Sequence, residues 1–576
     1  MFDLIIRGGT VVDGTGSPGV TADVGVRDGR IAAVGADLGA EAADVIDAAG
    51  AIVTPGFVDV HTHYDGQATW DDLLEPTSNH GVTTLVMGNC GVGFAPVAPG
   101  REEWLVQLME GVEDIPGTAL HEGITWGWES FPQYLDLLDS RSYAVDVAAY
   151  VGHGPVRAYV MGDRGARNEP ATPEDIARMA ALVSEAMDAG AVGFSSSRTL
   201  NHKARDGEPV PGSFAAMDEL SALAGAVARA GHGVFEVAPQ GMEFDRATYT
   251  RELAMLGEVA AAQDVPVSFL VLQHESDPDM WRMALDTADA SGGSMRPQVA
   301  ARPFGMMLGW EGYHFFAKRP TFAALATRMR GEELLAELLR PAVRAAILSE
   351  ADLPPDPTVQ FDGIGAGLAM MLHKVYAMGT PPDYEPTADR TVAAIAAERG
   401  VDSLAAAYDL MCEDGGKAFL MLPFFNYAEG NHDAIYEMLA HPATVSALSD
   451  GGAHCRMICD ASTPTYVVSH WGHGRSRGKH FTVEQAVRMQ TKDTADFIGF
   501  ADRGTIAVGK RADLNVIDLP RLGLAYPRAV NDLPAGGVRL VQDATGYRAT
   551  VVGGAITRRH GVDTGARPGR LVRSHG

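Results

Sequence analysis

Hydrophobic and polar positions follow three successive patterns along the chain. Residues 1–54 form short strand patterns separated by turn signals such as Gly8-Gly9 and Asp28-Gly29, which is typical of a small sheet. From about residue 55 to about residue 500, apolar strand patterns alternate with Ala-rich helical segments, for example 173–189, which predicts βα units and a parallel sheet. From about residue 502 the strand-and-turn pattern returns. We therefore expect an α/β protein whose two ends pair in one split β-sandwich.

Eight strand candidates lie in the middle part of the chain, which is the number that a (β/α)8 barrel requires. They are residues 56–61, 82–87, 145–151, 192–195, 233–238, 265–272, 418–422 and 445–449. A region rich in Met, Pro and aromatic residues, about 296–386, is too long for a simple barrel connection and is expected to be an insertion that caps the barrel mouth. The predicted architecture is a TIM-like barrel over 55–500, with β-sandwich parts at 1–54 and 501–576.

Composition and charge narrow the class of partner. Of the 576 residues 46% are hydrophobic and 21% charged, so the chain has enough apolar surface for a large core and is not disordered. The net charge of -28 repels nucleic acid and anionic membrane surfaces, which leaves a small-molecule substrate. No apolar stretch approaches the roughly 18 to 20 residues of a membrane span, and no signal-peptide pattern is seen, so we expect a cytoplasmic protein. Four cysteines are too few for a disulfide framework. The sequence leaves open whether the chain forms a homo-oligomer.

Two histidines two positions apart form the sharpest local feature. His61 and His63 stand in the run Gly56-Phe-Val-Asp-Val-His-Thr-His-Tyr-Asp65. Residues two apart on a strand project to the same face, so the two imidazoles are expected side by side. Neutral imidazole is a common zinc ligand. Two histidines on a strand are more often structural, but their place at the boundary between the two sequence patterns favours a metal site.

Two further residues are candidates for the same site. Asp450 closes a strand pattern in Ser449-Asp450-Gly451, where a carboxylate can bind a metal and take a proton from water. Alone, it would be interpreted as a turn or helix-capping residue. Cys90 lies between glycines in Gly88-Asn89-Cys90-Gly91, and a thiolate is a strong zinc ligand. Alone, it would be interpreted as a small buried hydrophobic residue.

Together these features resemble the amidohydrolase superfamily, and within it the D-aminoacylase or N-acyl-D-amino-acid deacylase family. The resemblance covers nearly the whole chain. It rests on residues 56–63, 81–91, 151–157, 449–451 and 509–514. The resemblance implies a distorted (β/α)8 barrel with a split β-sandwich. It also implies one or two Zn2+ ions bound by His61, His63 and Asp450, with Cys90 on the tighter or bridging ion and Asp450 as general base.

The chain departs from this family at two ligand positions. Such deacylases carry a zinc-binding histidine on the fifth barrel strand and another on the sixth, and here those places fall near Ala238 and Val271. Gln240 likewise falls where the family often has an arginine. The nearest substitute ligands are Glu236 and His274. If neither reaches the site, His61, His63, Cys90 and Asp450 remain, and the site holds one ion, a weakly bound ion or none.

The predicted reaction is hydrolysis of a C–N amide bond, most closely that of an N-acyl-D-amino acid or a related acyl amide. A metal ion lowers the pKa of its water and polarises the carbonyl, and Asp450 acts as general acid and base. His153 either donates a hydrogen bond to the oxyanion or substrate or ties a neighbouring loop. The preference for the D form comes from the resemblance alone. Two alternatives stay open: an altered or single-metal enzyme acting on a cyclic amide or lactone or as a lyase, and a non-catalytic binding protein derived from a hydrolase.

Substrate recognition is less well defined by the sequence. A guanidinium is the best partner for a substrate carboxylate, and Arg302 and Arg198 are candidates beside Lys203, although each has a plain salt-bridge interpretation. Aromatic residues of the insertion either line a pocket for a bulky acyl or aryl group or form core; they are Trp310, Tyr313 and Phe315. Cys455 and Cys459, with His454 adjacent, are interpreted as incidental spacing and not as a second metal site.

Overall fold

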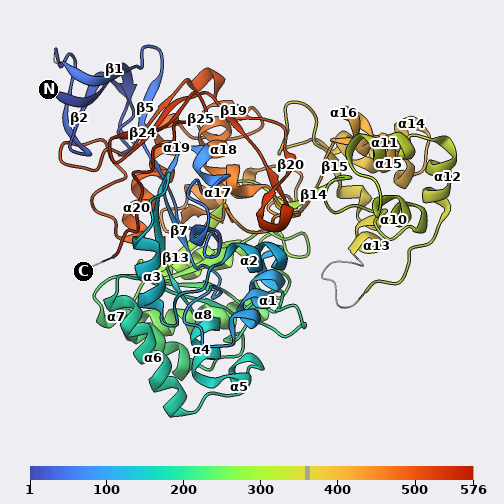
Figure 1. The fold of residues 1–576 in the computed structure, drawn as a ribbon, viewed down its shortest axis with the longest axis horizontal. Coiled ribbons are helices and arrows are strands. Elements are labelled where there is room, and N and C mark those ends of the chain that lie inside the picture. Colours follow the sequence, from blue (N-terminus) through green and yellow to red (C-terminus); the bar gives the residue numbers. More distant parts are fainter. Residues whose placement is uncertain (40, 357–363, 575–576) are drawn as a thin grey trace.

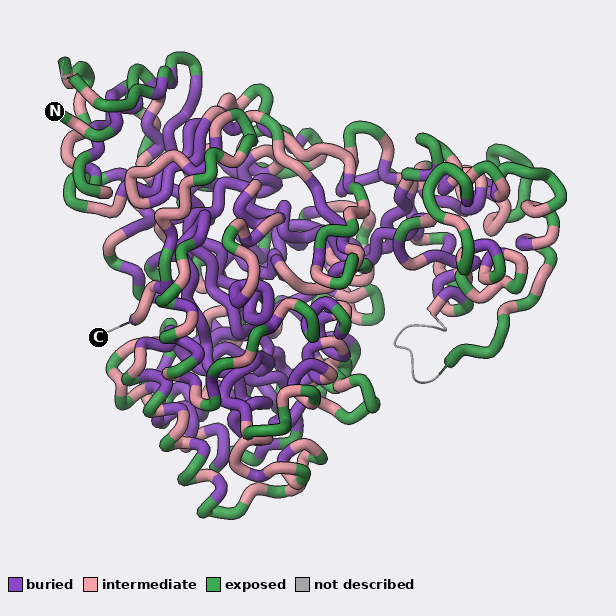
Figure 2. The backbone as a smooth tube through the Cα atoms, viewed as in Figure 1, coloured by how far each residue is buried: buried purple, intermediate pink, exposed green. Residues whose placement is uncertain are grey.

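A computed structural model of the chain describes residues 1–39, 41–356 and 364–574. These residues form a main body and a smaller helical lobe attached to one side of it (Figure 1). Buried residues concentrate along the centre of the main body, while exposed ones follow its periphery and the outside of the lobe (Figure 2). Among the described helices, none has the length and apolar character needed to cross a lipid bilayer. The expected cytoplasmic location stays a prediction.

Two parallel sheets form the middle of the main body. One holds β6 (Phe57–Asp59), β7 (Val82–Met87) and β8 (Asp146–Ala149). The other runs β17-β13-β12-β11-β10-β9, with β9 (Val151–Gly152), β10 (Gly193–Ser197), β11 (Val234–Ala238), β12 (Val267–Val271), β13 (Met295–Ala300) and β17 (Val445–Ala447). Tyr150 alone separates β8 from β9, and a parallel bridge joins Thr62 beyond β6 to Gly451 beyond β17. The sheets therefore meet at both edges in a TIM-barrel-like α/β arrangement.

Helices between the strands pack in sequence around this core, as in βα units. They include α6 (Pro173–Asp188), α7 (Met217–Arg229), α8 (Arg246–Gln263) and α9 (Met280–Ala290), each contacting the next. Helix α6 begins at a capping box in which Thr172 and Asp175 exchange hydrogen bonds, and Pro173 occupies its first turn. Its buried Met179, Val183 and Met187 recur every four residues, so one apolar face meets the sheet.

The seventh parallel strand differs from the expected one. The predicted strand at 418–422 belongs to β16 (Leu420–Phe425), which pairs antiparallel with β14 (Phe304–Leu308) and β15 (Tyr376–Ala377) in a separate sheet. In the parallel sheet, the position between β12 and β17 that was expected for this strand is occupied by β13. The apolar run of β16 resembles a buried parallel strand, whereas the Arg, Pro and Gln of β13 conceal one. Of these polar residues, Gln298 reaches the candidate metal centre.

The smaller lobe has a hydrophobic core of its own. It contains α10 (Pro320–Ala326), α11 (Gly331–Leu338), α12 (Pro341–Ser349), α13 (Ile364–Ala369), α14 (Val392–Arg399), α15 (Ser403–Met411) and α16 (Glu413–Gly416). Phe315 is buried in this core, and the ring of Trp310 stacks on Phe322 and meets Tyr408 edge-on. Trp310 and Phe315 therefore pack in the core of the lobe, which is the second of the two interpretations of these aromatic residues.

The two ends of the chain share one nine-stranded sheet, seen in Figure 1 where blue and red strands adjoin. Its strands are β1 (Phe2–Val11), β2 (Val20–Arg27), β3 (Arg30–Gly35), β4 (Ala42–Asp47), β5 (Ile52–Pro55), β18 (Leu514–Ile517), β23 (Tyr547–Val552), β24 (Ala555–Arg559) and β25 (Val562–Asp563). Strand β18 pairs antiparallel with β5, which leads directly into β6. The sheet thus anchors the start of the strand that carries His61. The residue boundaries of the predicted domains stay predictions.

Other elements connect these layers. They are α1 (Glu102–Glu113), α2 (Gly117–Gly123), α3 (Phe131–Asp139), α4 (His153–Met161), α5 (Asp163–Ala166), α17 (Asp433–Ala440), α18 (Thr463–Tyr466), α19 (Val483–Gln490), α20 (Lys492–Ile498), β19 (Gly523–Leu524), β20 (Arg528–Leu533), β21 (Gly537–Val541) and β22 (Ala544–Thr545). A π-helix, η6 (Val467–Gly474), follows α18 without a break.

Candidate metal centre

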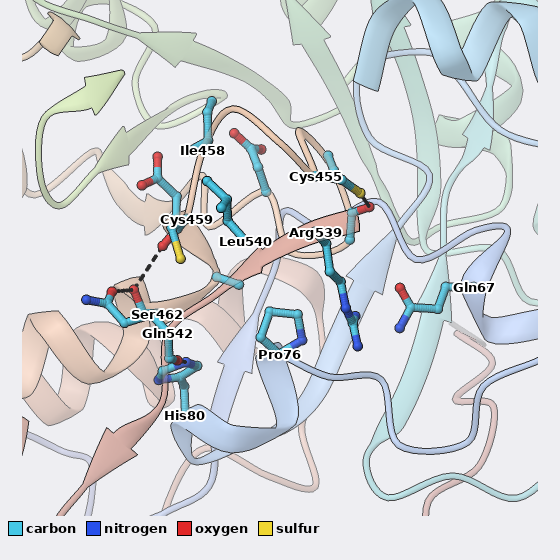
Figure 3. A pocket seen from close by; sticks show the side chains of 15 residues that line it. Gln67, Pro76, His80, Cys455, Ile458, Cys459, Ser462, Arg539, Leu540 and Gln542 are labelled. Carbon is cyan, nitrogen blue, oxygen red and sulfur yellow. Dashed lines mark hydrogen bonds between the residues drawn. The ribbon is translucent and has the colours of Figure 1, made fainter. Parts of the chain in front are cut away.

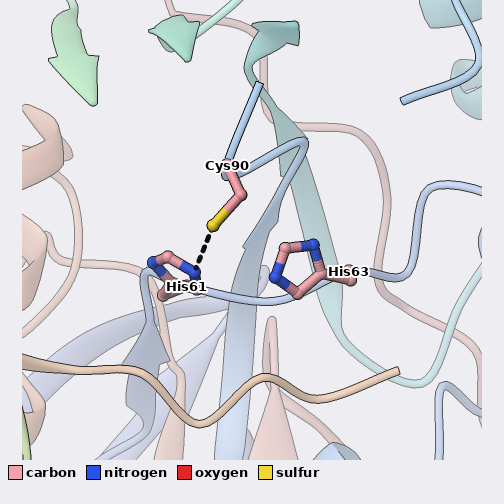
Figure 4. Close-up of side chains that lie close together, drawn as sticks. All are labelled: His61, His63 and Cys90. Atoms are coloured by element: carbon pink, nitrogen blue, oxygen red, sulfur yellow. Dashed lines mark hydrogen bonds between the residues drawn. The ribbon is translucent and has the colours of Figure 1, made fainter. Parts of the chain in front are cut away.

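Four of the predicted site residues lie just beyond the carboxyl ends of parallel strands. His61 and His63 follow β6, Cys90 follows β7 and Asp450 follows β17. This edge of a barrel-like sheet is where enzymes of such folds assemble their active sites. The side chains of His61, His63 and Cys90 point toward one another in Figure 4.

The distances between these side chains match those of ligands around one metal ion. His61 Nε2 lies 3.5 Å from Cys90 Sγ and 3.4 Å from Asp450 Oδ1, and His63 Nε2 lies 3.6 Å from the same oxygen. Ligand atoms of His61, His63 and Cys90 all lie within 4.8 Å of one another. A tetrahedral zinc ion with bonds of about 2.0 to 2.3 Å separates its ligands by about 3.3 to 3.8 Å. The three separations given first fall in this range, and they link His61 to Cys90 and both imidazoles to Asp450.

Gln298 determines which nitrogen of His61 faces the cluster. Its Oε1 lies 2.7 Å from His61 Nδ1, and its amide donates to Ser268 Oγ at 3.0 Å. Because the amide oxygen only accepts, His61 Nδ1 carries the proton and Nε2 presents a lone pair to the cluster. Burial lowers the pKa of His61 to about 4 and that of His63 to about 3, so both rings are neutral at pH 7. Gln298 comes from β13, the strand that sequence reasoning placed in the insertion.

This role of Gln298 is testable by measuring metal affinity. We expect Gln298→Ala to weaken zinc binding about 10- to 100-fold, because the Nδ1 proton of His61 loses its acceptor and the ring is no longer held in one tautomer. Competition with a chelator of known affinity measures the change. Gln263→Ala, which removes a glutamine bonded to Ser221 at the end of α8, is the matched control. Equal zinc affinity in the two variants would exclude an orienting role.

Of the two substitute ligands, Glu236 lies at the cluster and His274 does not. Glu236 Oε2 accepts the backbone N–H of Cys90 at 2.9 Å, while its buried Oε1 has no hydrogen-bond partner. Burial raises the pKa of Glu236 to about 8. His274 instead contacts Ser276 Oγ at 2.7 Å and packs against the ring of Phe244. The residue before His274 is bonded to Asn426, since the N–H of Gln273 donates to Asn426 Oδ1 at 2.9 Å and its carbonyl accepts the N–H of Asn426 at 2.8 Å.

Two site residues were missed by sequence reasoning. Glu113, the last residue of α1, places Oε1 3.4 Å from His63 Nδ1 and Oε2 3.6 Å from His454 Nε2. Burial raises the pKa of Glu113, with further contributions from Asp450 and Glu236, and burial lowers the pKa of His454 to about 4. Glu113 gives no sequence signal, since it ends an ordinary amphipathic helix. His454, four residues after Asp450, was noted only as a neighbour of Cys455.

Acidic side chains cluster around the two imidazoles. Glu113, Glu236 and Asp450 are all buried, and each raises the pKa of the Cys90 thiol, to which burial contributes most. No lysine or arginine is among the groups that shift the pKa of Glu113 or Glu236. Buried carboxylates without a cationic partner are costly. A bound divalent cation removes that cost, so the electrostatics of the site favour the same occupant as its geometry.

His153, Arg198 and Arg302 are held by other protein groups. The two ring nitrogens of His153 lie 2.9 Å from Ser196 Oγ and 2.9 Å from Glu219 Oε1. This is the structural tie that was the alternative to an oxyanion role. Arg198 pairs with Glu252, and Arg302 donates to Asp460 Oδ1 at 2.7 Å and to Ser462 Oγ at 3.0 Å. Both guanidinium groups are buried in these ion pairs, which does not support the predicted binding of a substrate carboxylate.

A pocket that Asp450 also lines contains two of the other cysteines, Cys455 and Cys459 (Figure 3). Cys455 and Cys459 line it together with His80, Arg539 and Gln542. His80 is satisfied on both ring nitrogens, by Thr465 Oγ1 and by the carbonyl of Gln542, each at 2.9 Å. Among the described residues, neither cysteine belongs to a group of three potential metal ligands.

Comparison with known proteins defines the class to which this fold and donor set belong. The protein-family model described as "Amidohydrolase family" matches residues 44–558. The chain belongs to the amidohydrolase family. An uncharacterized protein of Mycobacterium tuberculosis is 28% identical over 97% of this chain and 92% of its own length. D-aminoacylase of Alcaligenes xylosoxydans xylosoxydans is 41% identical over 194 residues, which cover 34% of this chain and 37% of that enzyme.

A solved structure of D-aminoacylase, described as having a binuclear metal centre, matches the whole of both chains with a TM-score of 0.65 and 26% identity. Together these likenesses place the chain on the D-aminoacylase-like branch. The predicted resemblance is therefore confirmed. The predicted enzyme class, a hydrolase acting on C–N bonds other than peptide bonds, is confirmed with it.

Proposed function

We propose that this protein hydrolyses the amide bond of N-acyl-D-amino acids. Zinc at His61, His63, Cys90 and Asp450 would be held at the carboxyl edge of a (β/α)8 barrel. The convergence of two neutral imidazoles, a thiol and a carboxylate within ligand distance carries the proposal. The D preference and the acyl amino acid come from D-aminoacylase, to which the chain is similar. Because Ala238 and Val271 supply no ligand, we propose one catalytic ion and not two.

The chain's own groups account for the proton transfers. When bound, the ion polarises the scissile carbonyl and lowers the pKa of a water toward about 7. Asp450 takes a proton from the attacking water and delivers it to the departing amine nitrogen. Its backbone N–H donates to the carbonyl of His61 at 3.2 Å, which holds the carboxylate over the cluster. Asp450 has a φ of 47°, so this placement needs the left-handed conformation.

A row of aromatic rings leads from the cluster to the surface. It runs His454, Phe304, Phe425, His274 and Phe244, with successive ring centroids 6.3, 6.0, 5.6 and 4.7 Å apart. The outermost ring, Phe244, is exposed. Such rings pack well against large apolar groups. We propose that this row receives a bulky apolar or aryl group of the substrate, the role that sequence reasoning gave to the insertion.

A substrate panel tests the proposed reaction. The zinc-loaded protein is incubated with N-acetyl and N-phenylacetyl derivatives of D- and L-leucine, and release of free amino acid is measured. We expect hydrolysis of the D derivatives, with the phenylacetyl amide preferred. If no N-acyl amino acid is cleaved while a cyclic amide is opened, the proposed substrate class is wrong.

The aromatic row makes a separate prediction about specificity. We expect Phe425→Ala to lower kcat/KM for the phenylacetyl substrate about 10-fold, because about 1.5 kcal/mol of apolar contact is lost, and to change the acetyl substrate little. Phe322→Ala, in the core of the lobe, is the control for general destabilisation. Equal losses on both substrates in Phe425→Ala would contradict the role of the row.

A further inference from the structure

A second group of metal-type donors lies apart from the proposed active site. Among the described residues, only two groups of three such side chains place ligand atoms within 4.8 Å of one another. The second consists of Glu385, His432 and His470. Glu385 lies between β15 and α14, His432 immediately precedes α17, and His470 lies in the π-helix η6. None of these residues was a candidate from the sequence, because no spacing motif links them.

Both imidazoles face the same carboxylate oxygen. His432 Nδ1 lies 3.7 Å and His470 Nε2 3.5 Å from Glu385 Oε2. The two rings are 5.3 Å apart with their planes at 69°. Nitrogen and oxygen ligands of a tetrahedral zinc ion at about 2.0 to 2.1 Å lie about 3.3 Å from one another. The observed separations exceed that value by a few tenths of an ångström.

The tautomer of His432 directs a lone pair of this ring at the carboxylate of Glu385. His432 Nε2 lies 2.9 Å from the carbonyl oxygen of Tyr384, which only accepts, so Nε2 carries the proton. With its proton on Nε2, the neutral ring presents an unprotonated Nδ1 to Glu385. His432 Nδ1 and His470 Nε2 are both buried without a hydrogen-bond partner. Nδ1 of His432 therefore faces the Glu385 carboxylate with a lone pair on each side, and a cation between the two would bind both.

The remaining hydrogen bonds hold the carboxylate in position. Glu385 Oε1 accepts the backbone N–H of His432 and Arg475 Nη2, each at 2.9 Å, and Arg475 Nε donates to Oε2 at 3.1 Å. Arg475 also donates to Asp433 at 2.8 Å, so its charge is shared between two carboxylates. Oε2 accepts the bond from Arg475 Nε with one lone pair, and its other lone pair is available to the two imidazoles. Supporting bonds of this kind orient the ligands of protein metal sites.

Secondary structure and exposure also suit a binding site. The π-helical turn places His470 in the cluster, and short π-helical stretches are frequent at functional positions. Tyr466 stacks on the His470 ring at 4.5 Å and fixes its plane. The His470 side chain is 18% exposed, against 0% for His432. The ring of His470 therefore lies nearer the surface than that of His432.

We propose that Glu385, His432 and His470 form a second binding site for a divalent transition metal ion of the zinc type. Two imidazoles and one carboxylate are a usual donor set for zinc. The bound ion would tie the segment that follows β15 to α17 and η6, and its role would be structural. This site uses no residue of the proposed catalytic centre, so either proposal can fail without the other.

Metal stoichiometry tests the site. Wild-type protein dialysed against zinc is expected to keep about two zinc ions per chain, and the His61→Ala/His63→Ala variant about one. Adding His470→Ala to that variant is expected to remove the remaining ion. His473→Ala, which removes an exposed histidine of the same π-helix, is the matched control and keeps it. X-ray absorption of the His61→Ala/His63→Ala protein is expected to show nitrogen and oxygen ligands without sulfur.

Several outcomes separate the two sites. If His470→Ala alone, with an unchanged circular dichroism spectrum, keeps as much zinc as wild type, the second site is excluded. Sulfur bonded to the ion in the His61→Ala/His63→Ala protein would also exclude it, because this donor set has no thiol. If the protein keeps about one zinc ion that only the His470 or His432 substitution removes, the second site holds and the catalytic proposal fails.

Discussion

Asp450→Asn is expected to lower kcat for amide hydrolysis by about 10²- to 10⁴-fold at saturating zinc. The amide has nearly the size of the carboxylate but cannot accept a proton from the attacking water or pass one to the leaving amine. The variant also loses an anionic ligand 3.4 Å from His61 Nε2, so its zinc affinity is expected to fall. Rates are therefore compared with zinc in excess, and zinc content is measured in the same samples.

A control variant separates this effect from general damage. Asp409→Asn removes a carboxylate that pairs with Arg344 in the lobe, and it is expected to leave kcat within about twofold. If Asp450→Asn with zinc bound retains nearly full kcat, another group moves the proton. Glu113 and Glu236 would then be the nearest carboxylates to test.

The His61→Ala/His63→Ala variant is expected to lose the metal ion of the candidate centre and, with it, the hydrolytic activity. We expect activity to fall by at least roughly 10³-fold, because the ion supplies several kcal/mol of transition-state charge stabilisation. Elemental analysis is expected to show less zinc than in wild type, and added zinc is not expected to restore activity. Retention of the catalytic rate in this variant would exclude metal-dependent hydrolysis at this cluster.

A buried histidine outside the cluster controls for the loss of buried rings. His80→Ala removes another buried histidine, one that bonds Thr465 and Gln542 outside the cluster. It is expected to lower thermal stability but to leave zinc content unchanged. A comparable loss of zinc from both variants would mean that folding damage, and not ligand removal, releases the ion.

Local features of the sequence predicted much of the fold and of the candidate metal centre. The spacing of His61 and His63 places both rings on one side of a strand end because side chains alternate along a strand. Strand patterns alternating with helical patterns indicated the parallel sheet. Strand β13 could not be found in this way, because its Arg296, Pro297 and Gln298 break the apolar run by which buried strands are identified.

The surroundings of the cluster depended on contacts between distant segments. Arg198 and Arg302 were candidates for a substrate carboxylate until the structure showed Glu252 and Asp460 beside them. The same holds for Glu113, which is an ordinary helix-end residue until α1 brings it within 3.4 Å of His63. Whether a charged side chain is free or paired depends on its neighbours in space, and local sequence does not encode those neighbours.

The sequence by itself determined the type of fold, the family and the four side chains of the candidate centre, since these follow from strand period, residue chemistry and short motifs. Only the tertiary structure decided the tautomer of His61 through Gln298, the approach of Glu113 and Glu236, the aromatic row, and the meeting of Glu385 with His432 and His470. The physical reason is that hydrogen bonds, ion pairs and metal coordination act over about 3 to 4 Å in space. The residues that they join lie tens to hundreds of positions apart in the chain.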